Sequence, residues 1–248
     1  MLPVGLMLLV VAIVFAAALL RTTFGFGDAV IGMPLLALLP VGLHTAVSLL
    51  SLCGLTVAGL ALATGRRQAD RPALARLLTA AVVGLPVGLT LVRFAPEAAT
   101  VAVLAAALAA YGVYGLTTDG APQAAQRPTD ARWAYAFGFL SGALGGAYNF
   151  NGTPVAIYGS LQGWPPHRFR GTLQAYFLAS GLLIVAGQAI GGLWPRNLGT
   201  LYAACLPAII AATLLGTRLS QRIPAERFRR AIFILILALA ALMLTRAL

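Results

Sequence analysis

Long apolar runs separated by short polar stretches make up most of this chain. Eight such runs lie at residues 3–20, 43–64, 73–92, 98–116, 133–147, 171–191, 198–216 and 231–246. A helix of about 20 apolar residues spans the roughly 30 Å hydrocarbon layer of a bilayer. The pattern therefore predicts an all-α polytopic membrane protein. The first run has no basic stretch before it, which favours a retained span over a cleaved signal peptide.

Two further apolar segments, 24–39 and 148–163, are shorter and are interrupted by small and polar residues. The first contains FGFGDAVIGMP, and the second overlaps GAYNFNGTP. A helix of that length covers only about 24 Å, and glycine weakens a helix. Pro34 and Pro154 each suit the first turn of a helix, where no N–H is needed. We therefore expect each segment to be an unwound stretch followed by a half-helix.

The two interrupted segments belong to a repeat that covers the chain. FGFGDAVIGMP at 24–34 aligns with LGGAYNFNGTP at 144–154, which lies 120 residues later. Further short matches, such as GLTLVRFAPE with GTRLSQRIPAE, follow in the same order. This order predicts two five-segment transmembrane halves, 1–116 and 133–248, joined by a polar cytoplasmic linker at 117–132.

Clusters of arginine give the relative orientation of the two halves. The net charge is +11, and the clusters follow the third and ninth segments. Their members are Arg66, Arg67, Arg71 and Arg76, and then Arg218, Arg222, Arg227, Arg229 and Arg230. The positive-inside rule places both clusters on the cytoplasmic side, which requires an even number of crossings between them. Five long segments separate the clusters, so segment 148–163 must cross as the sixth.

An inverted repeat with five crossings in each half follows from this count. Fourteen arginines then lie on the cytoplasmic side, and Arg93, Arg196 and Arg246 lie outside. If the interrupted segments entered the membrane and returned, the two arginine clusters would lie on opposite faces instead.

Composition narrows the class of function. The chain is 60% hydrophobic and 9% charged, whereas soluble domains are about 45–50% apolar and about 25% charged. The arginines flank apolar runs, which fits membrane orientation and not nucleic-acid binding. Cys53 and Cys205 are isolated inside apolar runs, so we expect no metal site and no cofactor. No nucleophile–base pair suggests an intramembrane enzyme.

The interrupted segments are the expected substrate site. Unwound backbone at membrane depth is tolerated only where protein or a water-filled cavity satisfies it. Paired half-helices place a site near the midplane, and their N-termini attract anions. Asn149, Asn151 and Thr153 add neutral donors, so we expect an oxyanion to bind without a buried positive charge. The alternatives are helix–helix hydrogen bonds for the asparagines and a capping role for Thr153.

The motifs GFGDAVIGMPLLALL, GGAYNFNGTPVAIY and WPPHRFRGTLQAYF resemble the sulfite exporter TauE/SafE family, also called toluene-sulfonate uptake permeases. The resemblance covers nearly the whole chain, in both halves. It implies export or uptake of small sulfur oxyanions and organic anions, such as sulfite, sulfonates or sulfoacetate, coupled to an ion gradient. The first half departs from a glycine triplet often found there, because Phe26 stands between Gly25 and Gly27 and Asp28 follows.

Asp28 is the only acid well inside an apolar stretch. It is a candidate for proton coupling, and the alternative is an N-cap of the following half-helix. Ser51 and Gln174 occupy related places in the two halves. Each either contacts the substrate or forms a hydrogen bond within the helix bundle. The residues expected to line the substrate site are Gly25, Gly27, Asp28, Pro34, Ser51, Tyr148, Asn149, Asn151, Gly152, Thr153, Pro154 and Gln174.

His167, Arg168 and Arg170 are expected at the cytoplasmic mouth, where arginines raise the local concentration of anions. The ordinary alternatives are a solvated histidine and arginines placed for topology. The sequence thus predicts a secondary anion transporter of a bacterial inner membrane that works by alternating access. Its partners would be a small anion, a coupling ion (H⁺ or Na⁺) and lipid. An anion channel and a carrier for non-sulfur carboxylates remain open, as does the oligomeric state.

Overall fold

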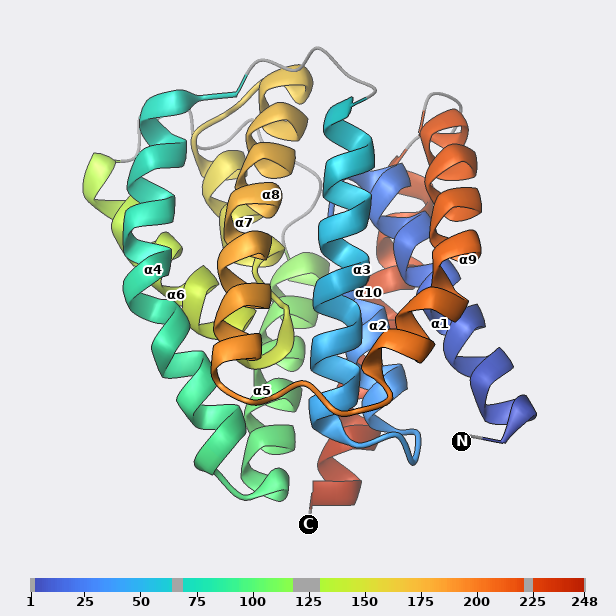
Figure 1. The fold of residues 1–248 in the computed structure, drawn as a ribbon. Helices are drawn as coiled ribbons and strands as arrows, with labels where there is room; N and C mark the ends of the chain where they lie inside the picture. The colour runs from blue at the N-terminus through green and yellow to red at the C-terminus, as the bar shows by residue number, and fades with distance from the viewer. Residues whose placement is uncertain (1–2, 64–68, 118–129, 221–224, 248) are drawn as a thin grey trace.

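Ten α-helices make up the described part of the chain, which covers residues 3–63, 69–117, 130–220 and 225–247 of a computed structural model (Figure 1). They are α1 (Val4–Phe24), α2 (Asp28–Ala37), α3 (Leu43–Ala63), α4 (Arg71–Phe94), α5 (Glu97–Thr117), α6 (Ala131–Tyr148), α7 (Gly152–Leu161), α8 (Pro166–Ile190), α9 (Leu198–Leu219) and α10 (Ala225–Ala247). Each apolar segment expected from the sequence corresponds to one helix. The prediction of an all-helical chain is confirmed.

Six of these helices are long and apolar enough to cross a membrane. By length and composition they are α1, α3, α4, α5, α8 and α9, counted over the described residues. This supports a multi-pass membrane protein. Most of the predicted linker (118–129) lies outside the described residues, as do Arg66, Arg67 and Arg222.

The helices stand side by side and alternate in direction (Figure 1). The two chain ends lie at the same end of the bundle, which requires an even number of passages along it.

Two sets of helix pairs correspond to each other. In one set α4 packs on α6 and α3 on α9, and in the other α9 packs on α1 and α8 on α4. Replacing each helix by the one five places along the chain turns one set of pairs into the other. The central pair, α3 with α8, and the pair of α5 with α10 map onto themselves.

The α4–α6 contact is the closest of these, because glycines bring the two backbones together. A Cβ on Gly88 would lie 2.0 Å from the Ala143 carbonyl oxygen, and one on Gly142 would lie 2.2 Å from that of Ala81. Small residues at such spacings allow close helix packing within membranes, where no hydrophobic effect drives helices together.

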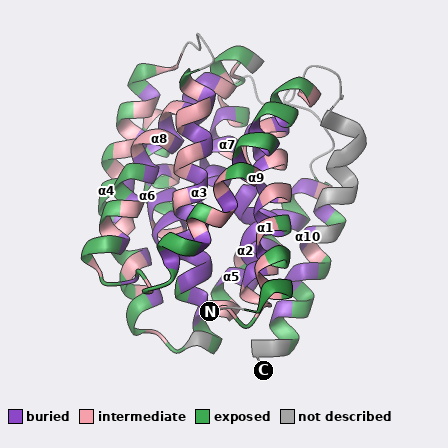
Figure 2. Ribbon diagram, turned by 45° about the vertical axis from the view of Figure 1, so that its right-hand side comes forward, coloured by how far each residue is buried: buried purple, intermediate pink, exposed green. Residues whose placement is uncertain are grey.

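The two short helices lie in the interior of the bundle (Figure 2). Of the ten residues of α2, eight are buried, and of the ten of α7, seven are buried. In contrast, six of the 24 residues of α4 are buried, because its outer face is exposed. The interruptions next to the short helices are therefore enclosed by protein, as unwound backbone requires.

Pro34 does not occupy the expected first helical turn. The helix α2 begins at Asp28, directly after the left-handed Gly27, so Pro34 is its seventh residue. Pro154 is the third residue of α7, as predicted. The two short helices begin 124 residues apart, at Asp28 and Gly152, and not 120 as the sequence alignment suggested. The alignment matched the two prolines, whereas the structure matches the ends of the interruptions.

Candidate functional site

The first interruption is a three-residue turn between α1 and α2. Gly25 ends α1 with a φ of 95°, and its N–H donates to the Arg21 carbonyl oxygen at 2.7 Å. Gly27 precedes α2 with a φ of 106°. Glycine adopts such left-handed angles at no steric cost, which explains the GFG motif.

The second interruption, between α6 and α7, uses asparagine for the same left-handed turn. Asn149 has a φ of 59°, and its N–H donates to the Gly145 carbonyl oxygen at 2.9 Å. Among the described residues it is the only non-glycine residue with a positive φ. Asparagine tolerates this region better than other side chains. The chain then passes through Phe150 and Asn151 into α7 at Gly152.

The two interruptions meet in the interior of the bundle. A Cβ on Gly152 would lie 3.4 Å from the Cβ of Phe26, so the second interruption contacts the first. A Cβ on Gly54 of α3 would lie 2.7 Å from Arg21 Nη1, 3.2 Å from Asp28 Oδ2 and 3.4 Å from Asn149 Nδ2. Polar groups from both interruptions therefore surround one point on α3.

A buried ion pair forms the centre of this cluster. The Arg21 guanidinium bonds the Asp28 carboxylate, and the two residues are 3% and 7% exposed. No other charged residue among the described ones belongs to the buried set. Two sequence-based expectations thus need correction. The site does contain a buried positive charge, and Arg21 lies inside the protein and not at a cytoplasmic loop.

Asp28 is not an N-cap of α2. It is the first residue of that helix, the N-cap position belongs to Gly27, and no side chain caps the helix. Its carboxylate turns to Arg21 because an isolated charge at this depth is costly and a partner offsets the cost.

Arg21 retains hydrogen-bonding capacity that its neighbours do not use. Its guanidinium lies 4.2 Å from the centre of the Phe177 ring on α8, and its buried Nε has no partner. Gln174, one turn before Phe177, is also only partly satisfied. Its Nε2 is 3.4 Å from the Gly25 carbonyl oxygen, which is a long hydrogen bond, and its Oε1 is buried without a partner.

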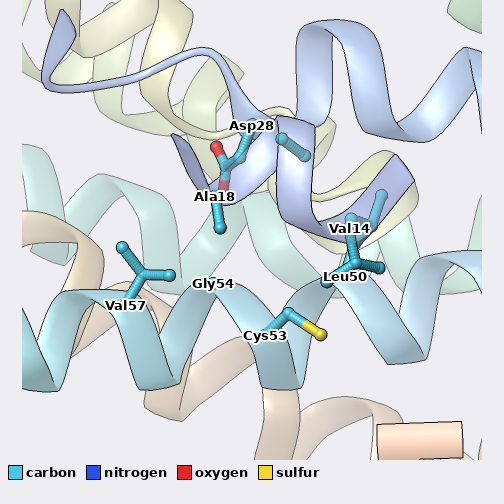
Figure 3. Close-up of a pocket in the computed structure, with 8 residues that line it drawn as sticks. Val14, Ala18, Asp28, Leu50, Cys53, Gly54 and Val57 are labelled. Atoms are coloured by element: carbon cyan, nitrogen blue, oxygen red, sulfur yellow. The ribbon is translucent and has the colours of Figure 1, made fainter. Parts of the chain in front are cut away.

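A small cavity adjoins the ion pair between α1, α2 and α3 (Figure 3). Its volume is about 10 Å³, which is at the lower limit for one water molecule. Asp28 is the only charged residue of its lining, and its carboxyl group is directed toward α3. The other lining residues are Val14, Ala17, Ala18, Leu50, Cys53, Gly54 and Val57. A sulfonate is larger than this space, so its entry requires the helices to move apart.

Several residues of the second interruption already have partners within the protein. The Asn151 amide donates to the Ser180 hydroxyl at 2.9 Å, and the Asn151 carbonyl accepts from Ser141. The Tyr148 hydroxyl donates to the Thr100 carbonyl oxygen at 2.7 Å. The bond from Asn151 to Ser180 joins the N-cap of α7 to α8, as in the alternative role of helix–helix hydrogen bonding considered for the asparagines. Thr153 and Pro154 are buried at the start of α7.

Ser51 and Gln174 hold the same position, the ninth residue, in α3 and α8. Their surroundings differ. Ser51 accepts a 2.8 Å hydrogen bond from Gln188 Nε2 and donates to the Val47 carbonyl oxygen. Its hydroxyl is therefore used both as acceptor and as donor within the bundle. Gln174 alone of the two contacts an interruption, through Gly25.

The three residues expected at the cytoplasmic mouth begin α8. His167 and Arg168 are exposed, and Arg168 lies 3.7 Å from Asp70. Arg170 is half-buried, and its Cγ lies 3.8 Å from the position of a Cβ on Gly25. Arg170 therefore reaches the first interruption, whereas the other two residues do not enter the cluster.

Cys53 and Cys205 are buried free thiols. Within the described residues no group of three or more metal-ligating side chains is present. The cluster therefore consists of one ion pair, two amides and backbone turns, a set suited to holding an anion.

Arg21, Phe177 and Gly54 are the residues that the sequence analysis missed. Arg21 had a usable signal, because a lone acid deep in an apolar segment needs a cation and Arg21 stands seven residues before Asp28. Phe177 and Gly54 had none, since phenylalanine and glycine are common in membrane helices.

The family model described as sulfite exporter TauE/SafE matches residues 10–243. No curated protein and no solved structure matches the chain.

Proposed function

The chain belongs to the sulfite exporter TauE/SafE family, and on this premise we propose that it carries a small sulfur-containing oxyanion or organic anion by alternating access. The family implies a membrane transporter of the sulfite or anion type. The substrate class, the binding site and the mode of transport are our proposals. Sulfite, sulfonates and sulfoacetate are the candidate substrates.

The observation that carries the proposal is the buried Arg21 at the meeting point of two interrupted helices. A guanidinium has five N–H donors in a planar fork that matches the oxygens of carboxylates, sulfonates and related anions. Arg21 makes one hydrogen bond to Asp28, and its Nε is unused. The Asn149 amide lies near the same point of α3 as Arg21, and the Gln174 amide bonds the Gly25 turn that ends α1. An anion at this point would meet both charge and neutral donors.

An approach to this site is provided by one face of α8. Arg170, Gln174 and Phe177 are spaced four and three residues apart, so they share a face of the helix. The half-buried Arg170 stands beside Gly25, Gln174 contacts it, and Phe177 stacks on Arg21. We propose that Arg170 attracts the anion from the cytoplasmic side and that Gln174 receives it.

Alternating access is supported by the closed site and by the matching packing of the halves. The cavity of about 10 Å³ admits no sulfonate, so the site must open for binding. Packing pairs that correspond between α1–α5 and α6–α10 would allow the halves to exchange arrangements and open the site to either side. The antiparallel courses of α1 and α6 in Figure 1 support an inverted repeat.

Transport by purified protein in liposomes tests the proposal. Sulfite, sulfoacetate, sulfate and acetate are offered in turn under imposed pH and Na⁺ gradients. We expect saturable uptake of a sulfur anion and accelerated exchange when the same anion is present inside. Current that rises in proportion to voltage without saturation would identify a channel, and preference for acetate would identify a carboxylate carrier. Liposomes without protein and with Arg21→Gln protein are the controls.

A further inference from the structure

We infer that the Asp28 carboxylate bonds Arg21 while no substrate is bound and that the transported anion takes its place. One proton enters with each anion and releases Arg21 from Asp28. This deepens the proposed function and rests on it. The substrate would displace Asp28 and not join it, so the two acceptors alternate on the same guanidinium.

Charge balance within the cluster is the first argument. Arg21 and Asp28 are the only charged residues in the buried set of the described chain, and they neutralise each other. A monovalent anion added to this pair would bury one uncompensated negative charge, which is costly in a medium of low dielectric constant. A proton taken up by Asp28 removes that charge. The carboxylate becomes a neutral carboxylic acid, and the guanidinium passes to the anion.

Unused hydrogen-bonding groups are the second argument. Asp28 takes one Arg21 donor, while the buried Arg21 Nε has no partner. A bidentate anion would engage a second guanidinium donor. The amide of Gln174 can turn to offer its NH₂ to the anion, because its present bond to Gly25 is long, at 3.4 Å.

The surroundings of Asp28 leave Arg21 as its principal charged partner. From α1 it faces Arg21, and from α3 it faces Gly54 and the thiol-bearing Cys53. From the end of α6 the neutral Asn149 amide lies near the same point of Gly54 as the Asp28 carboxylate, and from α8 Arg170 lies beside Gly25. The described side chains of α10, between 233 and 245, include no ionisable group. A proton on Asp28 thus changes one ion pair, and among the described residues no other carboxylate belongs to the buried set.

This arrangement fixes the stoichiometry. One proton accompanies each anion, whatever the charge of that anion. A monovalent sulfonate would move with no net charge, and divalent sulfoacetate would move with one net negative charge. Membrane potential should therefore alter only the second flux.

Proton counting in proteoliposomes tests the inference. Methanesulfonate and sulfoacetate uptake are measured together with internal pH, and potassium with valinomycin sets the voltage. We expect one proton per anion for both substrates, no response to a Na⁺ gradient, and a voltage response for sulfoacetate alone. Sulfonate uptake without protons would overturn the inference and leave the proposed function intact. No uptake of either sulfonate or of sulfite would overturn both.

Asp28→Asn provides an independent test because asparagine resembles the protonated acid in shape and charge. Exchange of internal for external anion by this variant should fall less than its net uptake, because exchange does not require the empty site to form. Its net uptake under a pH gradient should fall more than about tenfold, because the empty variant would bury an unpaired Arg21. Asp28→Glu should keep proton coupling. Retention of pH-driven net uptake by Asp28→Asn would contradict the inference.

Thr56→Val is the matched control. Thr56 lies on α3, two residues from Gly54, and its hydroxyl shares a 2.6 Å hydrogen bond with Tyr202 outside the cluster. Its replacement removes one interhelical hydrogen bond and should leave the proton-to-anion ratio at the wild-type value. A changed ratio in Thr56→Val would mean that coupling responds to general loosening of α3 and not to the ion pair.

Discussion

The two helix interruptions share a geometry but differ in chemistry. Between α1 and α2 the turn is made by glycines, and the adjacent polar groups are the charged Arg21 and Asp28. Between α6 and α7 the turn is made by Asn149, and the adjacent polar groups are neutral. The first interruption leaves Arg21 Nε without a partner, whereas Asn151 in the second is bonded to Ser180 and Ser141.

This difference teaches that an interrupted helix can serve two purposes. An ion pair with one hydrogen bond and a spare donor can exchange partners when a proton or an anion arrives. A set of neutral hydrogen bonds between helices keeps a turn in place, and breaking it gains nothing from a change of charge. We therefore propose that the first interruption binds the anion and couples its transport, and that the second mainly stabilises the fold. Asn149 is the residue of the second interruption that lies near Arg21 and Asp28.

Arg21→Gln should have the largest effect. Transport should fall about 100-fold, which corresponds to two charge-assisted hydrogen bonds of roughly 1.5 kcal/mol each. The variant also leaves Asp28 buried without its partner, at a cost of about 3–5 kcal/mol in stability. The measurement is initial uptake per amount of monodisperse protein. The double variant Arg21→Gln with Asp28→Asn should recover stability but not transport, and recovered transport would refute the role of Arg21.

Gly54→Ala should have the next largest effect. The new methyl group would lie 2.7 Å from Arg21 Nη1 and would push the guanidinium from its place. Overpacking costs of about 1–3 kcal/mol correspond to roughly tenfold slower transport. Gly59→Ala is the control on the same helix, because nothing lies within 4 Å of its added Cβ. Equal rates in the two variants would show that crowding at the ion pair is harmless.

Asn149 can be separated into backbone and side-chain roles. Asn149→Ala places alanine at a φ of 59°, at a cost of about 1–2 kcal/mol, whereas glycine adopts this angle freely. Asn149→Ala and Asn149→Gly both lose the amide. Both should therefore transport about fivefold more slowly, which corresponds to one hydrogen bond of roughly 1 kcal/mol. Only the alanine variant should melt at a lower temperature. A glycine variant with wild-type uptake would assign Asn149 to the turn alone.

Ser180→Ala should have the smallest effect on transport. It removes the partner of the Asn151 amide, which leaves a buried donor unpaired at a cost of about 1–3 kcal/mol. The melting temperature in detergent should fall, while uptake per folded protein should stay within about twofold of wild type. A large loss of uptake at unchanged stability would show that the second interruption also binds the substrate, contrary to the supporting role assigned to it.

The sequence analysis located both interruptions but did not predict the contacts that their residues make. It recognised Asp28 as a deep acid and counted Arg21 among the cytoplasmic arginines, because Arg21 closes an apolar run like the topology arginines do. It also favoured Asn151 as a ligand, whereas this amide bonds Ser180. Pairing across a turn and across helices depends on side-chain direction, which apolar periodicity does not specify.

Local physics is visible in the sequence alone: apolar length sets the number and extent of the helices, and glycine, asparagine and proline mark where two of them break. The family resemblance also rests on these local motifs. Only the tertiary structure decided that the breaks meet beside Gly54, that Arg21 neutralises Asp28, and that Pro34 lies inside α2. The reason is that a buried charge must find its partner in space, and many helix packings agree with the same pattern of apolar residues.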